Sequence, residues 1–281
     1  MRPIGPRAAT VEVGLQRVSM RYSRRGPWVL HAVEMHVPAG ALVYVEGENG
    51  CGKSTLLRIL ARVTVPTRGR VTGVPAQVGY VPERFPPSLS FSPSQYLAHL
   101  GRIRGMSKRV VVARSAELLE NIGAAAVADT PLAELSKGTC QKVAVAQALL
   151  GDPALLVLDE TFAGLDAAAQ AVVMEQVRAR RDASAAVVFT DHGGRARALT
   201  PDVRLLLAAG ALQSAAAPDQ LRMVVLVGRP GAFDAARHDG VRRVVCTAEG
   251  MRLQVDAAAC DAVLAAALAA GLSVRRVESG G

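Results

Sequence analysis

Hydrophobic positions recur in this chain with two different periods, and segments of the two kinds alternate along most of its length. Apolar residues at every second position, or in a short unbroken run, are typical of strands, whereas apolar residues three and four positions apart are typical of helices. We therefore expect strands at Val11–Tyr22, Val29–Val37, Ala41–Val45, Arg70–Gly73, Gln77–Val81, Ala154–Leu158, Ala185–Thr190 and Val203–Ala208. We expect helices at Lys53–Val63, Ser94–Ile103, Ser107–Asn121 and Ala167–Arg180.

The order of these segments predicts an α/β domain at residues 10–212, after a disordered lead-in at residues 1–9. Strands that alternate with helices favour a mainly parallel sheet. The first strands are expected to form an antiparallel β subdomain, and the central helices a small helical insertion at about residues 86–135. The connector before this insertion is stiffened by four prolines, which are Pro82, Pro86, Pro87 and Pro93.

A second, smaller domain is expected at residues 213–281. The composition shifts to Ala, Ser and Pro around Gly210–Pro218, which predicts a linker. The segments beyond it are strand-like or helical in the order Met223–Val227, Val241–Cys246, Met251–Val255, the helix Ala257–Ala270, and Ser273–Val277. This order indicates a small C-terminal α+β appendage of ferredoxin-like type.

A glycine-rich loop follows the buried run 41–45 and matches the phosphate-binding pattern G-x-x-x-x-G-K-[ST]. Its glycines let backbone N–H groups approach phosphates, and the helix that follows adds a partial positive charge. Lys53 is expected to reach the β and γ phosphates, and Ser54 to provide an oxygen to Mg²⁺. The loop therefore predicts a P-loop NTPase core, and the expected binding residues are Gly47, Asn49, Gly50, Cys51, Gly52, Lys53, Ser54 and Thr55.

Two acids end a buried apolar strand further along, at Leu155–Glu160. A carboxylate at a strand tip beside a phosphate loop is well placed to hold Mg²⁺ through water, and we expect this role of Asp159. Glu160 stands next to it, within reach of the same phosphates.

Four segments in one order resemble the ATP-binding cassette (ABC) family over roughly residues 10 to 215: Gly47–Thr55, Leu135–Thr139, Leu155–Glu160 and Asp191–His192. The resemblance implies that ATP is bound with Mg²⁺ and hydrolysed. It implies that Glu160 polarises the attacking water and that His192 hydrogen-bonds the γ-phosphate.

The segment Leu135–Thr139 looks like a variant of the family's LSGGQ signature, with Lys137 for glycine and Thr139 for glutamine. The resemblance implies that Ser136 and Gly138 bind ATP held by a second subunit. It also implies that Asp166 contacts the phosphate loop of that partner, so that ATP promotes a homodimer or heterodimer.

Two further positions follow from the resemblance. Tyr22 stands where the family places an aromatic ring that stacks on adenine, although Trp28 is a rival for this role. Glu83 stands where the family has a glutamine that contacts Mg²⁺ and links ATP to the membrane partner. A carboxylate can still bind Mg²⁺, but it has no amide donors and adds negative charge beside the triphosphate.

The four cysteines show no paired spacing, which favours a reducing cytosol over disulfides. Cys51 lies in the phosphate loop and Cys140 beside the signature. We expect alkylation of these thiols to slow turnover, and bound ATP to protect Cys51. Small packing residues are the alternative reading.

No run of about 18 apolar residues is present, and no secretory signal is recognised. The resemblance therefore implies a peripheral ATPase at the cytoplasmic face of the membrane, which drives a separately encoded permease through a contact surface at about Glu83–Arg109. The segments after Gly210 resemble the C-terminal extension of single-cassette drug and antibiotic exporters, which favours export.

Two alternatives remain open. One is a soluble ABC-type ATPase that acts on nucleic acid or the ribosome, since the net charge is +9. The basic residues are scattered, the stretch between Thr55 and Leu135 leaves no room for a long coiled coil, and only one cassette is present. The other alternative is a regulatory subunit with little turnover. Glu160 and His192 argue against it, whereas Glu83 and Lys137 favour it.

Overall fold

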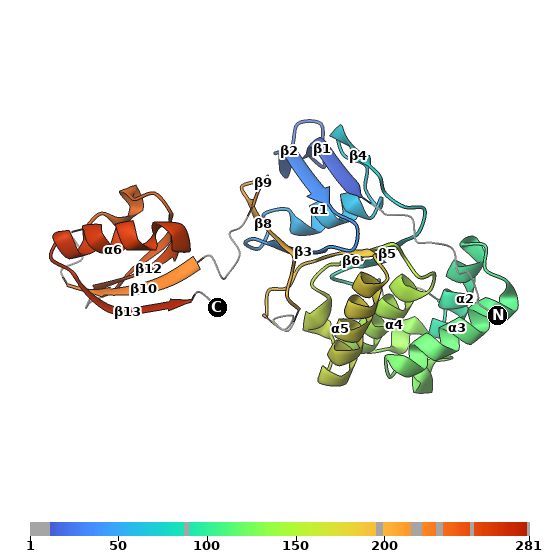
Figure 1. The fold of residues 1–281 in the computed structure, drawn as a ribbon. Helices are drawn as coiled ribbons and strands as arrows, with labels where there is room; N and C mark the ends of the chain where they lie inside the picture. Colours follow the sequence, from blue (N-terminus) through green and yellow to red (C-terminus); the bar gives the residue numbers. More distant parts are fainter. Residues whose placement is uncertain are drawn as a thin grey trace, which may run out of the picture. The chain divides into compact units, whose positions relative to one another are not determined.

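The fold is that of a computed structural model, which describes residues 12–86, 90–194, 199–214, 221–228, 233–247 and 250–279. The expected lead-in at residues 1–9, Pro87 of the connector and positions 215–218 of the expected linker lie outside this set. The chain divides into two compact units, Met1–Ser214 and Ala215–Gly281 (Figure 1).

Six strands form the central sheet of the first unit, in the order β5-β6-β7-β3-β8-β9. They are β3 Leu42–Glu46, β5 Val78–Val81, β6 Leu155–Leu158, β7 Ala186–Phe189, β8 Val203–Ala208 and β9 Ala211–Ser214. All neighbours pair in parallel except β8 and β9. The mainly parallel α/β core expected from the alternating pattern is confirmed.

Strand β9 occupies part of the segment expected to be a linker. Ala209 and Gly210 both have positive φ, of 48° and 76°, which suits a tight hairpin of type I′. The turn folds residues 211–214 back on β8, and Leu212 packs against the core. Composition missed this strand because alanine and serine say little about strand formation, whereas the hairpin turn decides it.

An antiparallel sheet of three strands accompanies the central sheet, in the order β2-β1-β4. Its strands are β1 Val13–Met20, β2 Leu30–Val37 and β4 Arg68–Thr72. Helix α1, Lys53–Leu60, buries its apolar side chains in the same core as these strands and one face of the central sheet. The phosphate loop is therefore held between two sheets.

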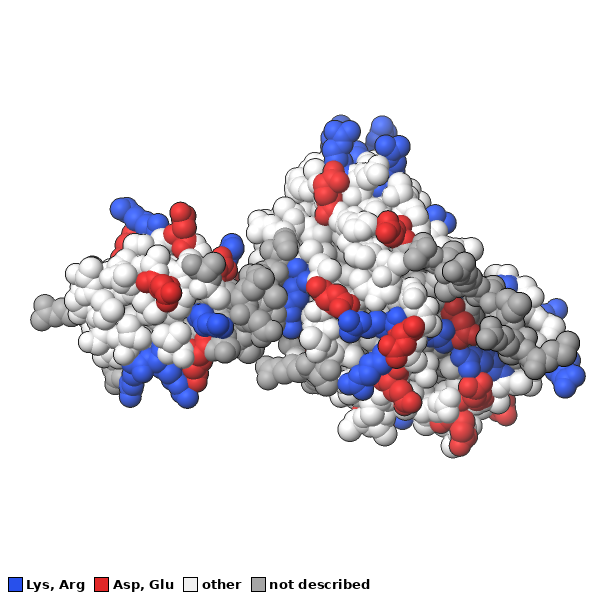
Figure 2. Space-filling view, in the orientation of Figure 1, with Lys and Arg blue, Asp and Glu red and all other residues white. Residues whose placement is uncertain are grey.

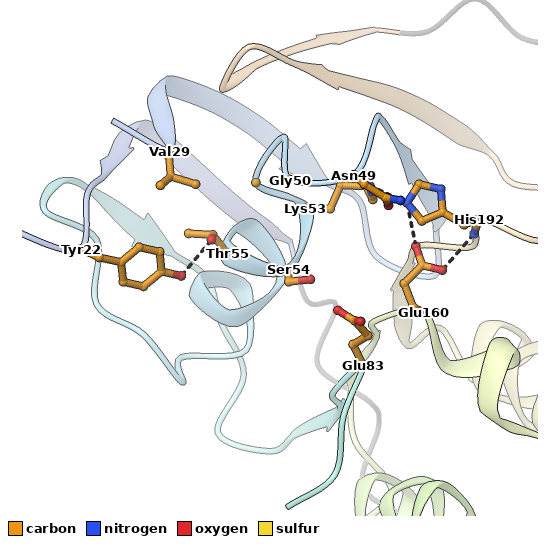
Figure 3. Close-up of a pocket in the computed structure, with 11 residues that line it drawn as sticks. Tyr22, Val29, Asn49, Gly50, Lys53, Ser54, Thr55, Glu83, Glu160 and His192 are labelled. Carbon is orange, nitrogen blue, oxygen red and sulfur yellow. Dashed lines mark hydrogen bonds and ion pairs between the residues drawn. The ribbon is translucent and has the colours of Figure 1, made fainter. Parts of the chain in front are cut away.

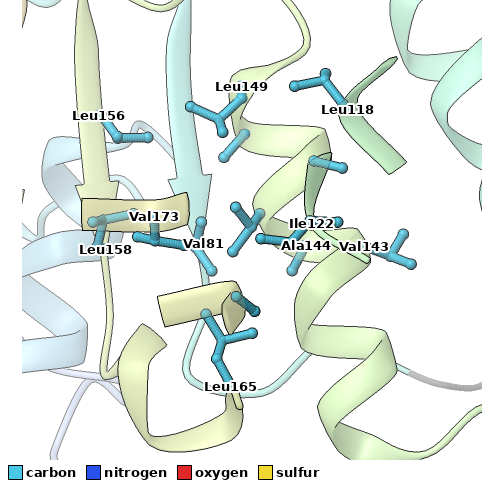
Figure 4. Close-up of a cluster of buried hydrophobic side chains, with 14 of the residues drawn as sticks. Val81, Leu118, Ile122, Val143, Ala144, Leu149, Leu156, Leu158, Leu165 and Val173 are labelled. Carbon is cyan, nitrogen blue, oxygen red and sulfur yellow. The ribbon is translucent and has the colours of Figure 1, made fainter. Parts of the chain in front are cut away.

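The remaining helices build a second core with the central sheet. They are α2 Pro93–Ile103, α3 Lys108–Asn121, α4 Lys137–Leu149 and α5 Ala167–Asp182. Ser92 starts α2 with a capping box that includes Gln95. Figure 4 shows part of this core, in which Val81 and Leu158 of the sheet lie near Ala144 of α4. Each buried leucine of this kind stabilises the fold by about 1.5–3 kcal/mol.

The second unit has four antiparallel strands in the order β11-β12-β10-β13, and α6 packs on one face. Its elements are β10 Leu221–Val227, β11 Val241–Thr247, β12 Gly250–Asp256, α6 Cys260–Ala269 and β13 Ser273–Ser279. This is the strand order of a ferredoxin-like sheet. Between β10 and β11, however, the described residues hold one 3₁₀ turn, Ala235–Arg237, in place of the first helix.

Among the described residues, no helix combines the length and the hydropathy that crossing a bilayer requires.

Candidate functional site

A pocket of about 410 Å³ opens beside the start of α1 (Figure 3). It is lined by Tyr22, Val29, Asn49, Gly50, Gly52, Lys53, Ser54, Thr55, Glu83, Glu160 and His192. These residues come from segments that are far apart in the sequence, and several of them follow the carboxyl ends of the parallel strands β3, β5, β6 and β7. Ligands of open α/β sheets bind at such a position.

The glycines of the loop have the backbone that the motif requires. Gly50 and Gly52 have φ of 79° and 111°, in the region that favours glycine. A Cβ at Gly47 would lie 2.4 Å from the carbonyl oxygen of Leu207, so a side chain there would collide with β8. No side chain caps the start of α1, which leaves its first N–H groups available to an anion.

Lys53 is buried at the base of the loop, and its ammonium group has three hydrogen-bond acceptors. Its Nζ lies 2.8 Å from the carbonyl oxygen of Gly47 and 2.9 Å from that of Glu48. It also lies 2.9 Å from Nε2 of His192. Since an ammonium can only donate, Nε2 of His192 is the acceptor, and a neutral ring carries its proton on Nδ1. The loop and His192 thus meet through one side chain.

Asp159 lies fully buried beneath the pocket and accepts hydrogen bonds from three hydroxyls. Its Oδ1 accepts from Ser54 at 3.1 Å and from Thr190 at 3.4 Å, and its Oδ2 accepts from Tyr80 at 3.4 Å. Burial raises the pKa of Asp159 above its ordinary value, and the hydrogen bond from Ser54 opposes this shift. The site therefore holds a desolvated carboxylate that would gain from a nearby cation.

Glu160 is anchored by one carboxylate oxygen and offers the other. Its Oε2 accepts from the backbone N–H of His192 at 2.9 Å. Its Oε1 is buried and has no hydrogen-bond partner among the described residues, although Nε2 of His192 is 3.6 Å away. The backbone of Glu160 is left-handed, with φ of 48°, and its N–H donates to the Thr190 hydroxyl at 2.9 Å.

Tyr22 and Trp28, the two candidates for the adenine contact, lie in different surroundings. The Tyr22 side chain lines the pocket, is 62% exposed, and shares a hydrogen bond of 2.9 Å with the Thr55 hydroxyl. The Trp28 ring is not part of the lining and contacts the guanidinium groups of Arg21 and Arg68, at 4.7 and 5.1 Å from its centroid.

Glu83 lines the pocket, and its negative charge is one of the causes that raise the pKa of Asp159. Figure 3 shows its carboxylate turned toward the Ser54 side of the pocket. It forms an ion pair with Arg84, whose Nε lies 3.8 Å from Oε1.

The two thiols singled out in the sequence differ in access, although both are free. Cys51 is half-buried, with its Sγ close to Gly47. Cys140 is buried at the start of α4, its thiol contacts the carbonyl oxygens of Leu132 and Leu135, and burial raises its pKa. The structure therefore favours the alternative reading of Cys140 as a packing residue, because the thiol is neither exposed nor readily ionised.

Ser136, Gly138 and Asp166 do not line the pocket. Ser136 is exposed and caps α4 by accepting from the Thr139 N–H at 3.2 Å. Asp166 is exposed, caps α5 and forms an ion pair of 2.7 Å with Lys142. A single chain therefore presents these residues on its surface, apart from the pocket that contains Lys53.

Several residues of the site were not predicted. Val29 lines the pocket, and Thr190 and Tyr80 hold Asp159. Gln141 of α4 is buried and donates from Nε2 to the carbonyl oxygen of Pro82 at 3.0 Å, which ties the signature helix to the loop that carries Glu83. No local pattern marks these residues, because their place in the site depends on contacts between distant segments.

Comparisons with known proteins point to one family. A family model described as ABC transporter matches residues 30–163. The probable metal transport system ATP-binding protein of Treponema pallidum is 37% identical over 165 residues, which are 58% of this chain and 68% of that protein. The zinc import ATP-binding protein ZnuC of Halorhodospira halophila is 32% identical over 198 residues, 68% of this chain and 73% of that protein. The Nod factor export ATP-binding protein I of Neorhizobium galegae is 31% identical over 203 residues, 68% of this chain and 58% of that protein.

Solved structures show the same fold. The ATP-binding subunit of an ABC transporter superposes with a TM-score of 0.65 at 24% identity, over 73% of this chain and 90% of that chain. A dimeric bacterial ABC transporter cassette superposes with a TM-score of 0.63 at 22% identity, over 72% of this chain and 98% of that chain.

Proposed function

Because this chain belongs to the ABC transporter family and is an ATPase, we propose that it is the subunit that drives a separately encoded membrane permease by hydrolysing ATP. The observation that carries this proposal is the meeting of Lys53, Glu160 and His192 in one pocket, from three distant segments. The geometry matches what binding and hydrolysis of a nucleoside triphosphate require, namely a cation, an acid and a phosphate sensor around a glycine loop.

The phosphate loop would bind the triphosphate. The N–H groups at the start of α1 would donate to the β-phosphate, and the Lys53 ammonium would exchange its bonds to Gly47 and Glu48 for phosphate oxygens. Asn49 and Gly50 line the same side of the pocket. Tyr22 would stack on the adenine, since its exposed ring lines the pocket.

The residues beneath the loop fit Mg²⁺. The Ser54 hydroxyl and the Asp159 carboxylate lie 3.1 Å apart, and hard oxygen donors of this kind suit magnesium. The described residues contain no cluster of three or more His, Cys, Asp and Glu side chains suited to a metal, so the phosphates and water would complete the shell. Ser54 and Asp159 would hold the ion, with Glu83 beside them. When bound, the ion neutralises charge on the β and γ phosphates.

Glu160 is the residue that we assign to the attacking water. Its Oε1 is a buried acceptor that has no hydrogen-bond partner among the described residues. Glu160 would orient the water and accept its proton while the new bond to the γ-phosphorus forms and the bond to the β-γ bridging oxygen breaks. His192 would donate to the γ-phosphate, and the loss of that contact would report hydrolysis.

We propose that the active unit is a dimer, either of two copies or of this chain with a related one. Ser136, Gly138 and Asp166 lie at the surface and outside this chain's own pocket, which suits residues that complete the pocket of a partner. Lys137 is exposed beside them and would add positive charge facing the partner's ATP.

The permease contact is proposed at the surface Glu83–Arg109, at the cytoplasmic face of the membrane. Ile103 within this surface is 81% exposed, and the neighbouring Val110 is 53% exposed. Apolar side chains that remain this exposed are suited to a protein partner. The hydrogen bond between Gln141 and Pro82 links the residue immediately before this surface to the signature helix.

The direction of transport is a finer proposal. The relatives named above include a metal transporter, a zinc importer and an exporter of Nod factor. Five further relatives are also named zinc import ATP-binding proteins. These names favour import of a metal over the drug or antibiotic export that was expected from the C-terminal unit. The permease, rather than this chain, would determine the transported substrate.

The alternative of a nucleic-acid-dependent ATPase receives no support from the face shown in Figure 2. Figure 2 shows acidic and basic side chains interspersed on the face in view, without a basic stripe. A protein that binds nucleic acid generally gathers its basic residues on one face.

The proposal is tested by recovering tagged protein from detergent-solubilised native membranes. We expect a stoichiometric multi-spanning partner, which is lost with Ile103→Glu and kept with Val65→Glu, since Val65 is 83% exposed outside the proposed surface. Recovery of the wild type and of Val65→Glu with ribosomes or DNA, or with no membrane partner, would refute the transport function. The identity of the partner would also distinguish metal import from export.

A further inference from the structure

The side chain of Thr190 contacts both acids of the site. Thr190 follows β7 and is fully buried. Its hydroxyl accepts from the backbone N–H of Glu160 at 2.9 Å and donates to Oδ1 of Asp159 at 3.4 Å. A hydroxyl has one hydrogen to donate and can accept at the same time, so a single group satisfies both contacts. The end of β7 is also held to β6, because the Thr190 N–H donates to the carbonyl oxygen of Leu158 at 3.0 Å.

We propose that Thr190 is the residue that positions Asp159 and Glu160 relative to each other for metal binding and hydrolysis. This inference rests on the roles proposed above for the two acids. Glu160 needs such support because its left-handed backbone, with φ of 48°, is costly for a residue with a side chain. The hydrogen bond from its N–H to a fixed acceptor holds that conformation and so aims the carboxylate at the pocket.

The same hydroxyl helps to fix the orientation of the Asp159 carboxylate. Ser54 and Thr190 donate to Oδ1 from two sides, and Tyr80 donates to Oδ2. These three donors determine how the buried carboxylate is rotated. Because Thr is branched at Cβ, its χ1 angle is restricted, and the hydroxyl of a fully buried threonine has little freedom to turn away.

Thr190 also stands two residues before His192. The backbone N–H of His192 donates to Oε2 of Glu160 at 2.9 Å, so the segment 190–192 holds Glu160 at its backbone and at its carboxylate. A second hydrogen bond fixes this segment, since the Tyr44 hydroxyl donates to the carbonyl oxygen of Asp191 at 2.9 Å. The end of β7 thus forms a rigid support for the acids that follow β6.

The test uses the full chain with Thr190→Val, which removes the hydroxyl and keeps the shape, and Thr190→Ser, which keeps the hydroxyl. For T190V we expect kcat to fall about 10- to 100-fold, as is typical when an outer partner of a metal site is removed. We also expect a higher Mg²⁺ concentration to be needed for tight binding of a fluorescent ATP analogue, with its metal-free affinity unchanged. T190S should restore both quantities toward wild type.

Two controls separate positioning from general packing. Tyr80→Phe removes a donor to Asp159 and a contact with Arg58 but leaves Glu160 untouched, so it should shift the Mg²⁺ requirement and change kcat less than T190V does. Ser115→Ala removes a buried hydroxyl that has no partner among the described residues, far along the chain in α3, and should change neither quantity. If T190V is recovered unfolded, Thr190→Ala carries the same test.

An active wild type with T190V equal to it in kcat and in Mg²⁺ requirement would refute the positioning role alone. Equal losses in T190V and T190S would refute it as well, because the hydroxyl would then not be the cause. A wild-type chain that does not bind the analogue would refute the proposed roles of both acids, and this inference with them.

Discussion

The Nζ of Lys53 donates a hydrogen bond of 2.9 Å to Nε2 of His192. This contact joins the phosphate loop to the end of β7 across the pocket, and it occupies the ring nitrogen that would otherwise face a γ-phosphate. ATP binding would therefore exchange this bond for contacts from both residues to the phosphate. His192 is, in this state, an acceptor from lysine rather than a donor to substrate.

This exchange predicts how His192→Ala behaves. The variant removes a bond that ATP has to displace, so ATP affinity should remain unchanged or rise. It also removes a donor to the transferring phosphate, so kcat should fall by about 10²- to 10³-fold. Binding of a fluorescent ATP analogue and steady-state turnover measure the two effects separately. Weaker ATP binding with unchanged kcat would contradict the assignment.

The phosphate loop predicts different costs for two glycine substitutions. Gly47→Ala places a Cβ 2.4 Å from the carbonyl oxygen of Leu207, whereas Gly50→Ala meets nothing within 4 Å. Gly50→Ala should cost about 1 kcal/mol of unfolding free energy from its positive φ, and Gly47→Ala distinctly more, because the backbone of β8 cannot yield easily. Urea unfolding of both variants tests this order, and equal losses would contradict it.

The raised pKa of Asp159 predicts that this buried carboxylate lowers the free energy of unfolding at neutral pH. A carboxyl whose pKa is higher in the folded chain than in the unfolded chain binds its proton more tightly when folded. The stability of the fold therefore falls as the pH rises from the unfolded pKa to the folded pKa. It stays reduced at any pH above both values. Asp159→Asn should therefore be more stable than wild type at pH 7, and the difference should shrink as the pH approaches the unfolded pKa. Unfolding curves at several pH values measure this, with Asp182→Asn, at an exposed carboxylate, as the control.

The exposure of the four thiols predicts the order in which a maleimide reagent labels them. Cys246 is exposed and should react first, while Cys140 and Cys260 are buried and should react only as the chain unfolds. Half-buried Cys51 should react at an intermediate rate and be protected by ATP. Mass spectrometry of peptides after timed labelling checks the order, and a rate at Cys51 that ATP does not change would refute the protection.

Local sequence determined most of the fold and the chemistry of the pocket. The period of the apolar residues placed most of the helices and strands to within a few positions, because burial on one face repeats with the geometry of each element. The loop Gly47–Thr55 was recognisable because its glycines and its lysine serve one local structure. Ser136, which was singled out within the signature segment, caps α4.

The tertiary structure decided what depends on contacts between distant segments. Thr190 and Asp159 are joined only because β6 and β7 pair in parallel, and no local pattern marks that hydroxyl as part of the site. Cys140 was expected to be reactive from its place beside the signature, yet packing buries it. The strand β9 exists because a hairpin turn returns the chain to β8. A local pattern specifies an element and its exposed chemistry, whereas burial and cross-strand partners are properties of the assembled core.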